Sequence, residues 1–346
     1  MTRIRILLLC LCAAVATARA AENAAVVRSE FIYETAAFPQ CHASTIVEAA
    51  DGGLVAAWFG GTRESHVDVG IWVSRFEHGR WSAPVEVANG VQPDGTRYSS
   101  YNPVLFQPKQ GPLVLFYKTG PDVWRWWGMR MTSIDGGRTW SPAEPVAQAG
   151  TGPSKNKPLE LADGTLVAGT ETGPKTKARD ARWRLRFLRS TDLGRTWTVN
   201  SDIDQGTVVA ALQPSIVPLG GNALLALGRT TQGKMFEVRS DDNGKSWGPV
   251  GLIDVPNSHS GTDAVKLRDG RYLLVYNHSD SKRYPLNVAI SADARSWRKV
   301  LTLEEEPNTH GYAYPAVIQT RDGLVHVTYT WDRARIRHAI IDPAAL

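Results

Sequence analysis

The chain has 346 residues, with 39 lysine and arginine side chains against 34 aspartates and glutamates, and a formal net charge of +5. Residues 1–20 hold three of the arginines and no acid, which leaves 36 cations against 34 acids, a charge close to +2, in the remainder. So small an excess gives little support to nucleic-acid binding, and we expect none. Cys41 is the only cysteine after residue 20, which excludes an internal disulfide in that part of the chain.

Residues 1–20 have the pattern of a secretory signal peptide. A basic start is followed by the short apolar run 6–16 and by the small-residue cleavage site Ala18-Arg19-Ala20. The apolar run is too short to span a bilayer, and no later segment is apolar enough, so we expect no membrane insertion. The pattern predicts an exported protein, periplasmic or secreted, in which residues 21–346 form a single domain.

Six repeats follow, each a tight-turn signal leading into a short apolar strand. The turns begin 49 to 59 residues apart, at Asp51, Gln110, Asp163, Gly220, Asp269 and Asp322. A second strand-like segment precedes each turn, so each repeat contains a hairpin. A strand-rich repeat near 50 residues is typical of a β-propeller. We therefore predict an all-β, six-bladed propeller of four-stranded antiparallel blades, closed by pairing of a strand near Phe31 with the last blade.

The pattern Ser-x-Asp-x-Gly-x-x-Trp occurs at residues 133–140, 190–197 and 240–247, and a shorter form without the glycine occurs at 291–297. The aspartate can accept hydrogen bonds from N–H groups of the turn, and the glycine supplies a positive φ. The tryptophan can pack between sheets. Each motif offers one carboxylate, whereas a metal ion needs several converging ligands, so we expect no metal and no cofactor.

The hairpin geometry indicates where a ligand would bind. The first strand of each hairpin starts, and the second ends, at the edge opposite the turn, so these positions should converge at one mouth of the propeller. The first-strand starts contribute His42, Lys157, Gln213, Asp263 and Tyr314. The second-strand ends and the loops after them contribute Arg63, Asp68, Trp126, Glu171, Arg229 and Arg283. Arginines and indoles suit an acidic sugar, although each residue alone could equally be a solvated rim residue.

Together the repeats and Asp-box motifs resemble the sialidase (neuraminidase) superfamily, and especially its bacterial exported neuraminidase-like proteins, over nearly the whole of residues 21–346. The resemblance implies six blades, three arginines for the substrate carboxylate, an aspartate acid/base and a tyrosine–glutamate nucleophile pair. Arg229 and Arg283 match the second and third arginines. Arg63 resembles the arginine after the first Asp-Gly strand, Asp68 resembles the acid/base, and Tyr314 matches the nucleophile.

Two positions depart from that pattern. Where the superfamily has Arg-Ile-Pro, this chain has His42-Ala-Ser, so the first arginine is missing. Gln213 stands where the glutamate that activates the tyrosine is expected, and an amide cannot act as a base. Hydrolysis of sialosides by the usual route is therefore not expected.

Our leading interpretation is a glycoside hydrolase that releases a terminal acidic sugar, sialic acid or a related monosaccharide, from glycans. Asp68 would protonate the leaving oxygen, which requires a raised pKa, and Tyr314 would be the nucleophile or stabilise the oxocarbenium ion. Glu171 or Asp263 would replace the missing base. The alternatives are a polysaccharide lyase, in which His42 and Tyr314 act on a uronate, and a non-catalytic carbohydrate-binding propeller. The sequence leaves the sugar, the linkage and the oligomeric state open.

Overall fold

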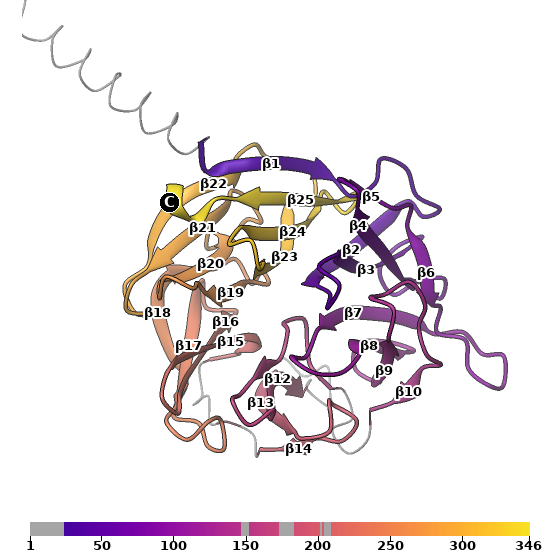
Figure 1. The fold of residues 1–346 in the computed structure, drawn as a ribbon, viewed down its shortest axis with the longest axis horizontal. Helices are drawn as coiled ribbons and strands as arrows, with labels where there is room; N and C mark the ends of the chain where they lie inside the picture. The colour runs from indigo at the N-terminus through magenta and orange to yellow at the C-terminus, as the bar shows by residue number, and fades with distance from the viewer. Residues whose placement is uncertain (1–23, 147–151, 173–182, 201–202, 204–208) are drawn as a thin grey trace, which may run out of the picture.

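The computed structural model describes residues 24–146, 152–172, 183–200, 203 and 209–346, so the predicted signal peptide lies outside the described residues. Within them, 25 strands form six antiparallel sheets arranged around a central axis (Figure 1). The innermost strands are β2 (Gln40–Glu48), β7 (Ser99–Phe106), β11 (Leu159–Glu160), β15 (Leu212–Gly220), β19 (Asp263–Lys266) and β23 (Tyr312–Gln319). This arrangement confirms the predicted six-bladed propeller.

Each inner strand pairs with the next strand of its own hairpin. The second strands are β3 (Leu54–Gly61), β8 (Leu113–Gly120), β12 (Leu166–Thr172), β16 (Ala223–Arg229), β20 (Tyr272–Asn277) and β24 (Val325–Trp331). The third strands are β4 (Gly70–Glu77), β9 (Trp127–Ser133), β13 (Arg184–Ser190), β17 (Lys234–Ser240), β21 (Leu286–Ser291) and β25 (Arg335–Ile341). The core lies between neighbouring sheets; Val55 of the first blade, for example, packs in one cluster with Leu113 and Leu115 of the second.

The outer strands are β1 (Val26–Phe31), β5 (Arg80–Trp81), β6 (Val85–Ala88), β10 (Glu144–Pro145), β14 (Thr198–Val199), β18 (Gly251–Pro256) and β22 (Arg298–Glu304). In the first blade two short strands, β5 and β6, share the outermost position, because each pairs with a different part of β4. The N-terminal strand β1 pairs with β25 of the last blade, which closes the ring as predicted. The chain ends in a short 3₁₀ helix, η1 (Pro343–Ala345).

The Asp-box turns form as the sequence predicts. In the third motif, Asp242 accepts hydrogen bonds from Ser246 N at 2.9 Å and Ser246 Oγ at 2.6 Å, and Gly244 has a φ of +74°. Trp247 stacks on Phe187 of the preceding blade, with 3.7 Å between ring centroids. In the shorter motif Ala294 takes the positive φ, 54°, without a glycine.

These turns lie on the face opposite the inner-strand starts. Arg138 of the first motif pairs with Asp51, in the turn between β2 and β3, at 3.2 Å, so the Asp boxes and the hairpin turns share one edge of the blades. No helix in the part of the chain that the structure describes has the length and hydropathy of a membrane span.

Candidate functional site

Four inner strands carry a bulge near their start, where a residue other than glycine adopts a positive φ. These residues are Ala43 at 56°, Asn102 at 44°, Gln213 at 54° and Tyr314 at 52°, and the strand register shifts at each of them. Three of the four precede a proline. Positive φ is uncommon outside glycine and bulges redirect side chains, so this repeated feature makes the mouth at the strand starts the candidate site.

Tyr314 lies at the centre of a cluster drawn from several blades. Arg229 Nη1 donates a hydrogen bond to the Tyr314 hydroxyl at 3.1 Å, and Gln213 Nε2 donates to the same oxygen at 3.4 Å. The His42 ring lies 4.3 Å from the Tyr314 ring, centroid to centroid, and the Arg283 guanidinium lies 6.0 Å from it. The structure therefore brings together five of the residues that hairpin geometry assigned to this face.

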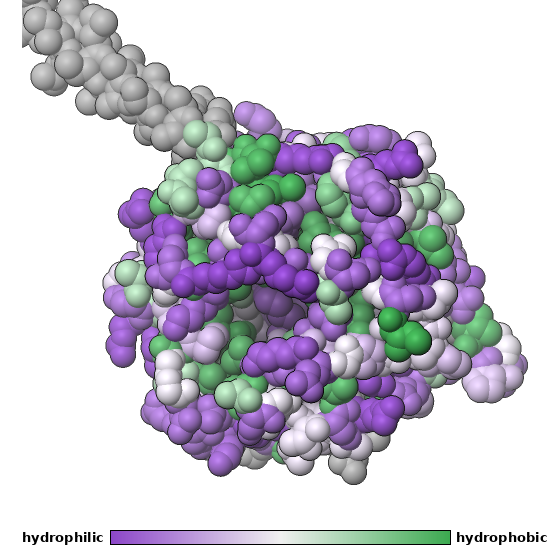
Figure 2. Space-filling model, in the orientation of Figure 1, coloured by the Kyte–Doolittle hydropathy of each residue, from purple (hydrophilic) through white to green (hydrophobic). Residues whose placement is uncertain are grey.

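The cluster is strongly cationic. Burial lowers the pKa of His42 well below its usual value, and the nearby charges of Arg333, Arg283 and Arg229 act in the same direction. His42 is therefore neutral at neutral pH, with Nδ1 at 3.1 Å from Thr330 Oγ1. Burial also lowers the pKa of Arg283. Figure 2 shows one face of the whole propeller, with hydrophilic side chains around a central hollow; that view does not identify the residues of this cluster.

Lys155 is a site residue that the sequence analysis missed. Its ammonium donates to Asn156 Oδ1 at 2.8 Å and to the backbone oxygens of Thr262 and Pro315 at 2.6 and 2.5 Å. Burial lowers the pKa of Lys155 to about 7, although the three acceptors match the three protons of its charged form. The sequence predicted Lys157 at the start of this inner strand, but the positive φ of 65° falls on Lys155.

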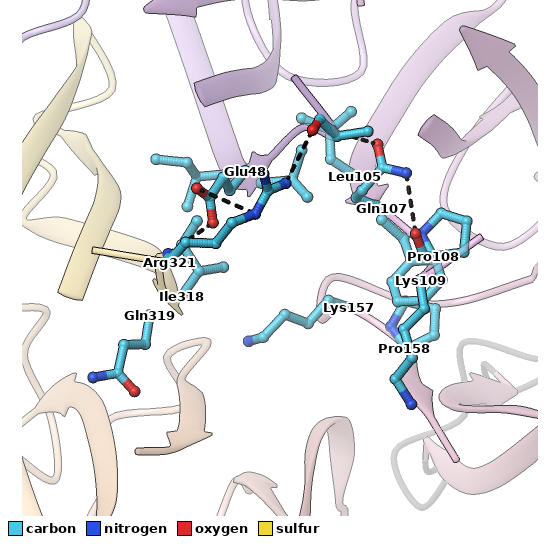
Figure 3. Close-up of a pocket in the computed structure, with 14 residues that line it drawn as sticks. Glu48, Leu105, Gln107, Pro108, Lys109, Lys157, Pro158, Ile318, Gln319 and Arg321 are labelled. Carbon is cyan, nitrogen blue, oxygen red and sulfur yellow. Dashed lines mark hydrogen bonds and ion pairs between the residues drawn. The ribbon is translucent and has the colours of Figure 1, made fainter. Parts of the chain in front are cut away.

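Lys157 and Asp263 pair with each other, and neither is among the groups found to contact the Tyr314 side chain. Lys157 Nζ donates to Asp263 Oδ2 at 2.8 Å, and Asp263 also accepts from Ser215 Oγ at 2.7 Å. Burial opposes ionisation, but Lys157 and Lys155 hold the pKa of Asp263 below its usual value. Lys157 also lines a cavity of about 600 Å³ with Glu48 and Gln319, which lie at the far ends of inner strands (Figure 3). This pair therefore connects to the opposite mouth of the propeller.

Glu171 and Trp126 belong to a buried group in the wall between the second and third blades. Ser154 Oγ donates to Glu171 Oε1 at 2.5 Å, and Lys118 Nζ lies 2.6 Å from Ser154 Oγ and 3.6 Å from Glu171. The Trp126 ring lies 4.5 Å from the Lys118 ammonium. Glu171 is thus engaged by Lys118 and Ser154, and it is not among the groups found to contact the Tyr314 hydroxyl.

Asp68 and Arg63 lie in the loop after β3. Asp68 accepts from Thr62 N at 3.0 Å and Thr62 Oγ1 at 2.6 Å, and it contacts His66 Nδ1 at 2.7 Å. Burial acts to raise the pKa of Asp68, but these contacts hold it below its usual value. The raised pKa expected of a general acid is therefore absent in the free protein. Arg63 is exposed beside Glu64, which pairs with Arg333 at 2.7 Å.

Within the described residues, no group of three or more histidine, cysteine, aspartate or glutamate side chains is placed to hold a metal ion.

The fold and this clustered mouth define a propeller of the sialidase fold. Residues 52–327 match the family of the BNR repeat-like domain, and the chain belongs to that family. No curated protein matches the chain.

Solved structures resemble the chain at low sequence identity. A protein of unknown function from Dyadobacter fermentans has a TM-score of 0.75 and 18% identity, covering 92% of this chain and 98% of its own. The NanB sialidase of Streptococcus pneumoniae has a TM-score of 0.72 and 14% identity, and the match covers 92% of this chain and 71% of the NanB chain. An intramolecular trans-sialidase from Ruminococcus gnavus has a TM-score of 0.70 and 14% identity, and the match covers 93% of this chain and 99% of the trans-sialidase chain. At these identities the likeness shows the fold.

Proposed function

We propose that the protein is an exported glycoside hydrolase that releases a terminal acidic sugar from glycans. One observation carries the proposal: Arg229 and Arg283 both flank Tyr314, and no carboxylate of the described chain pairs with either arginine. Arg229 Nε is buried without a hydrogen-bond partner among the described residues. A substrate carboxylate would supply the missing counter-ion, and guanidinium groups bind carboxylates through parallel hydrogen bonds.

The proposed chemistry assigns one role to each group of the mouth. The Tyr314 oxygen would attack the anomeric carbon as the glycosidic bond breaks, and its phenolate would be stabilised by the hydrogen bond from Arg229. The leaving oxygen would take a proton from Asp68, once substrate replaces its present partners and raises its pKa. Gln213 cannot accept the phenol proton, whereas His42 is a neutral base beside the tyrosine ring. Water would then attack the anomeric carbon and give a proton to the Asp68 carboxylate, while the bond to the tyrosine oxygen breaks and the phenolate takes its proton back from His42.

The neutral state of His42 also favours a second candidate, a lyase acting on uronates. In that reaction His42 would remove the proton α to the carboxylate, and Tyr314 would protonate the leaving oxygen. The arginines would stabilise the negative charge that develops on the carboxylate. A carbohydrate-binding protein without activity would use the arginines alone.

Product analysis separates the three functions. The purified protein would be incubated with sialosides, other acidic glycosides and uronate-containing polysaccharides. Hydrolysis yields saturated ends, elimination yields an unsaturated uronate that absorbs in the near ultraviolet, and binding alone yields neither. We expect saturated acidic monosaccharide. An unsaturated product would show that the protein is a lyase and would contradict the proposed hydrolase.

Arg283→Lys tests the proposed carboxylate clamp. It keeps the charge but loses the planar fork, so we expect binding or turnover of the acidic substrate to fall by at least ~1.5 kcal/mol, or about tenfold. Titration of the best substrate from the panel would measure the loss. Wild-type behaviour of both Arg283→Lys and Arg283→Ala would show that this arginine does not contact the substrate.

A further inference from the structure

Aromatic side chains gather on the mouth side of the second and third blades, beyond the cluster around Tyr314. Trp124 lies in the loop between β8 and β9, and Trp183 immediately precedes β13. Their rings stack with centroids 5.4 Å apart and an interplanar angle of 25°. Trp124 is 46% exposed, which is unusual for so large an apolar side chain. Two neighbouring blades therefore present a single indole surface to solvent.

The loop that carries Trp124 is held in place by aromatic contacts with other elements. Trp126 meets Tyr101 of β7 edge-to-face at 5.4 Å, and Trp127 meets Tyr98 in the same way at 5.7 Å. Asp122 accepts from Trp124 N at 2.9 Å and is paired with Arg125 at 2.6 Å. The loop is therefore held both by aromatic contacts with other elements and by polar contacts within itself. A ligand would meet an ordered surface, so little binding free energy would be lost in ordering it.

A chain of contacts links the loop of this surface to the proposed acidic-sugar site. Trp126 covers the Lys118 ammonium, which contacts Ser154. The next residue, Lys155, donates to the backbone oxygen of Pro315, beside Tyr314. Arg125, in the same loop as Trp124, is paired with Asp122, so the exposed indole of Trp124 itself offers an apolar face.

We propose that Trp124, stacked on Trp183, is a platform for the neutral sugar that precedes the terminal acidic sugar in the glycan. The C–H face of a pyranose would cover the exposed indole, while the acidic sugar occupies the mouth at Tyr314. The proposal rests on the proposed function for the position of the acidic sugar. It narrows the substrate class to oligosaccharides with an acidic end and a neutral pyranose next to it.

Binding measurements test the platform by comparing sugars of two lengths. Isothermal titration would compare 3′-sialyllactose with sialic acid, and cellobiouronic acid with glucuronic acid. One of these two pairs should bind to the wild type. Within that pair, the longer sugar should have a dissociation constant about threefold to tenfold lower than the shorter sugar. Trp124→Ala should abolish this difference, and Trp124→Phe should retain part of it. Ile134→Ala, at a 94% exposed position in an Asp-box turn on the opposite face, is the matched surface control.

Binding measurements with neutral sugars separate failure of the platform from failure of the proposed function. Ligand-observed NMR with lactose and cellobiose should detect weak binding to the wild type that Trp124→Ala loses, with the melting temperature confirming that the variant is folded. If Trp124 is needed for binding of the neutral sugars but the acidic sugars do not bind, the proposed acidic-sugar site is wrong and the platform is supported. If binding of neither the acidic nor the neutral sugars depends on Trp124, the stacked pair serves only to anchor its loop and the platform is wrong.

Discussion

Gln213 donates to the Tyr314 hydroxyl through its amide nitrogen, and its buried amide oxygen has no hydrogen-bond partner among the described residues. The amide thus orients the phenol without being able to deprotonate it. His42, which stands beside the same ring, cannot supply the charge of an arginine because burial keeps it neutral. At the scale of single residues, these two positions distinguish this mouth from that of a sialidase with a tyrosine–glutamate pair.

We therefore expect little or no turnover of ordinary α-linked sialosides. A fluorogenic sialoside assay of the wild type beside Gln213→Glu measures this directly, with Tyr314→Phe as the inactive control. Both proteins should be inactive, because the carboxylate clamp also lacks its first arginine. Wild-type turnover at rates typical of enzymes (~1–1000 per second) would contradict the expectation. Activity in Gln213→Glu alone would show that this position suffices to exclude sialosides.

Lys155 gives the molecule a pH dependence with a defined sign. Its pKa is about 7 in the folded protein against an ordinary value of 10.5, so between these values the unfolded chain binds more protons than the folded chain. Stability contributed by this group therefore rises with pH across that window, by at most ~1.4 kcal/mol per pH unit. Urea unfolding at pH 7, 8 and 9 should show the wild type gaining stability relative to Lys155→Met. Parallel pH profiles of the two proteins would contradict this prediction.

Among the structural elements, the Asp-box turn shows most clearly how a short motif holds two blades together. Gly194 has a φ of +77°, and a Cβ there would lie 2.4 Å from Phe116 Cζ and 2.9 Å from Trp197 Cζ2. The glycine thus serves both the backbone conformation and the close packing of the tryptophan. Ala294 shows that the conformation alone does not require glycine.

Gly194→Ala and Gly270→Ala separate these two contributions. Gly270 has a φ of +92° with nothing within 4 Å of an added Cβ. We expect Gly270→Ala to cost ~1–2 kcal/mol from backbone strain, and Gly194→Ala to cost a further ~1–3 kcal/mol from overpacking. Chemical denaturation of both variants provides the comparison. Equal losses would mean that the blades move apart to accommodate the extra methyl group without cost.

Across the whole molecule, the ring depends on a strand from the far end of the chain. β1 pairs with β25 from Val26 to Phe31, and Phe31 lies under the guanidinium groups of Arg335 and Arg337, at 3.6 and 4.8 Å. Without β1, β25 would become an open sheet edge, which promotes association between molecules.

A chain that begins after Phe31 should therefore melt at a lower temperature and aggregate, whereas a chain that begins at Ala24 should not. Differential scanning calorimetry and light scattering would record both effects. Retention of the full melting temperature after loss of residues 24–31 would show that the other five blades hold the last one in place without ring closure.

The sequence by itself determined the number of blades, the hairpins, the Asp-box turns and the face on which Tyr314, Arg229 and Arg283 meet. Those features follow from periodicity and turn chemistry, which act over a few residues and repeat along the chain. Only the tertiary structure decided that Lys155 rather than Lys157 bonds to the backbone next to Tyr314, that Lys118 pairs with Glu171, and that Thr62 and His66 hold the pKa of Asp68 low. These outcomes depend on burial and on contacts between separate strands and loops. A side chain's partner and pKa are set by the groups that the fold places around it, which local sequence patterns do not specify.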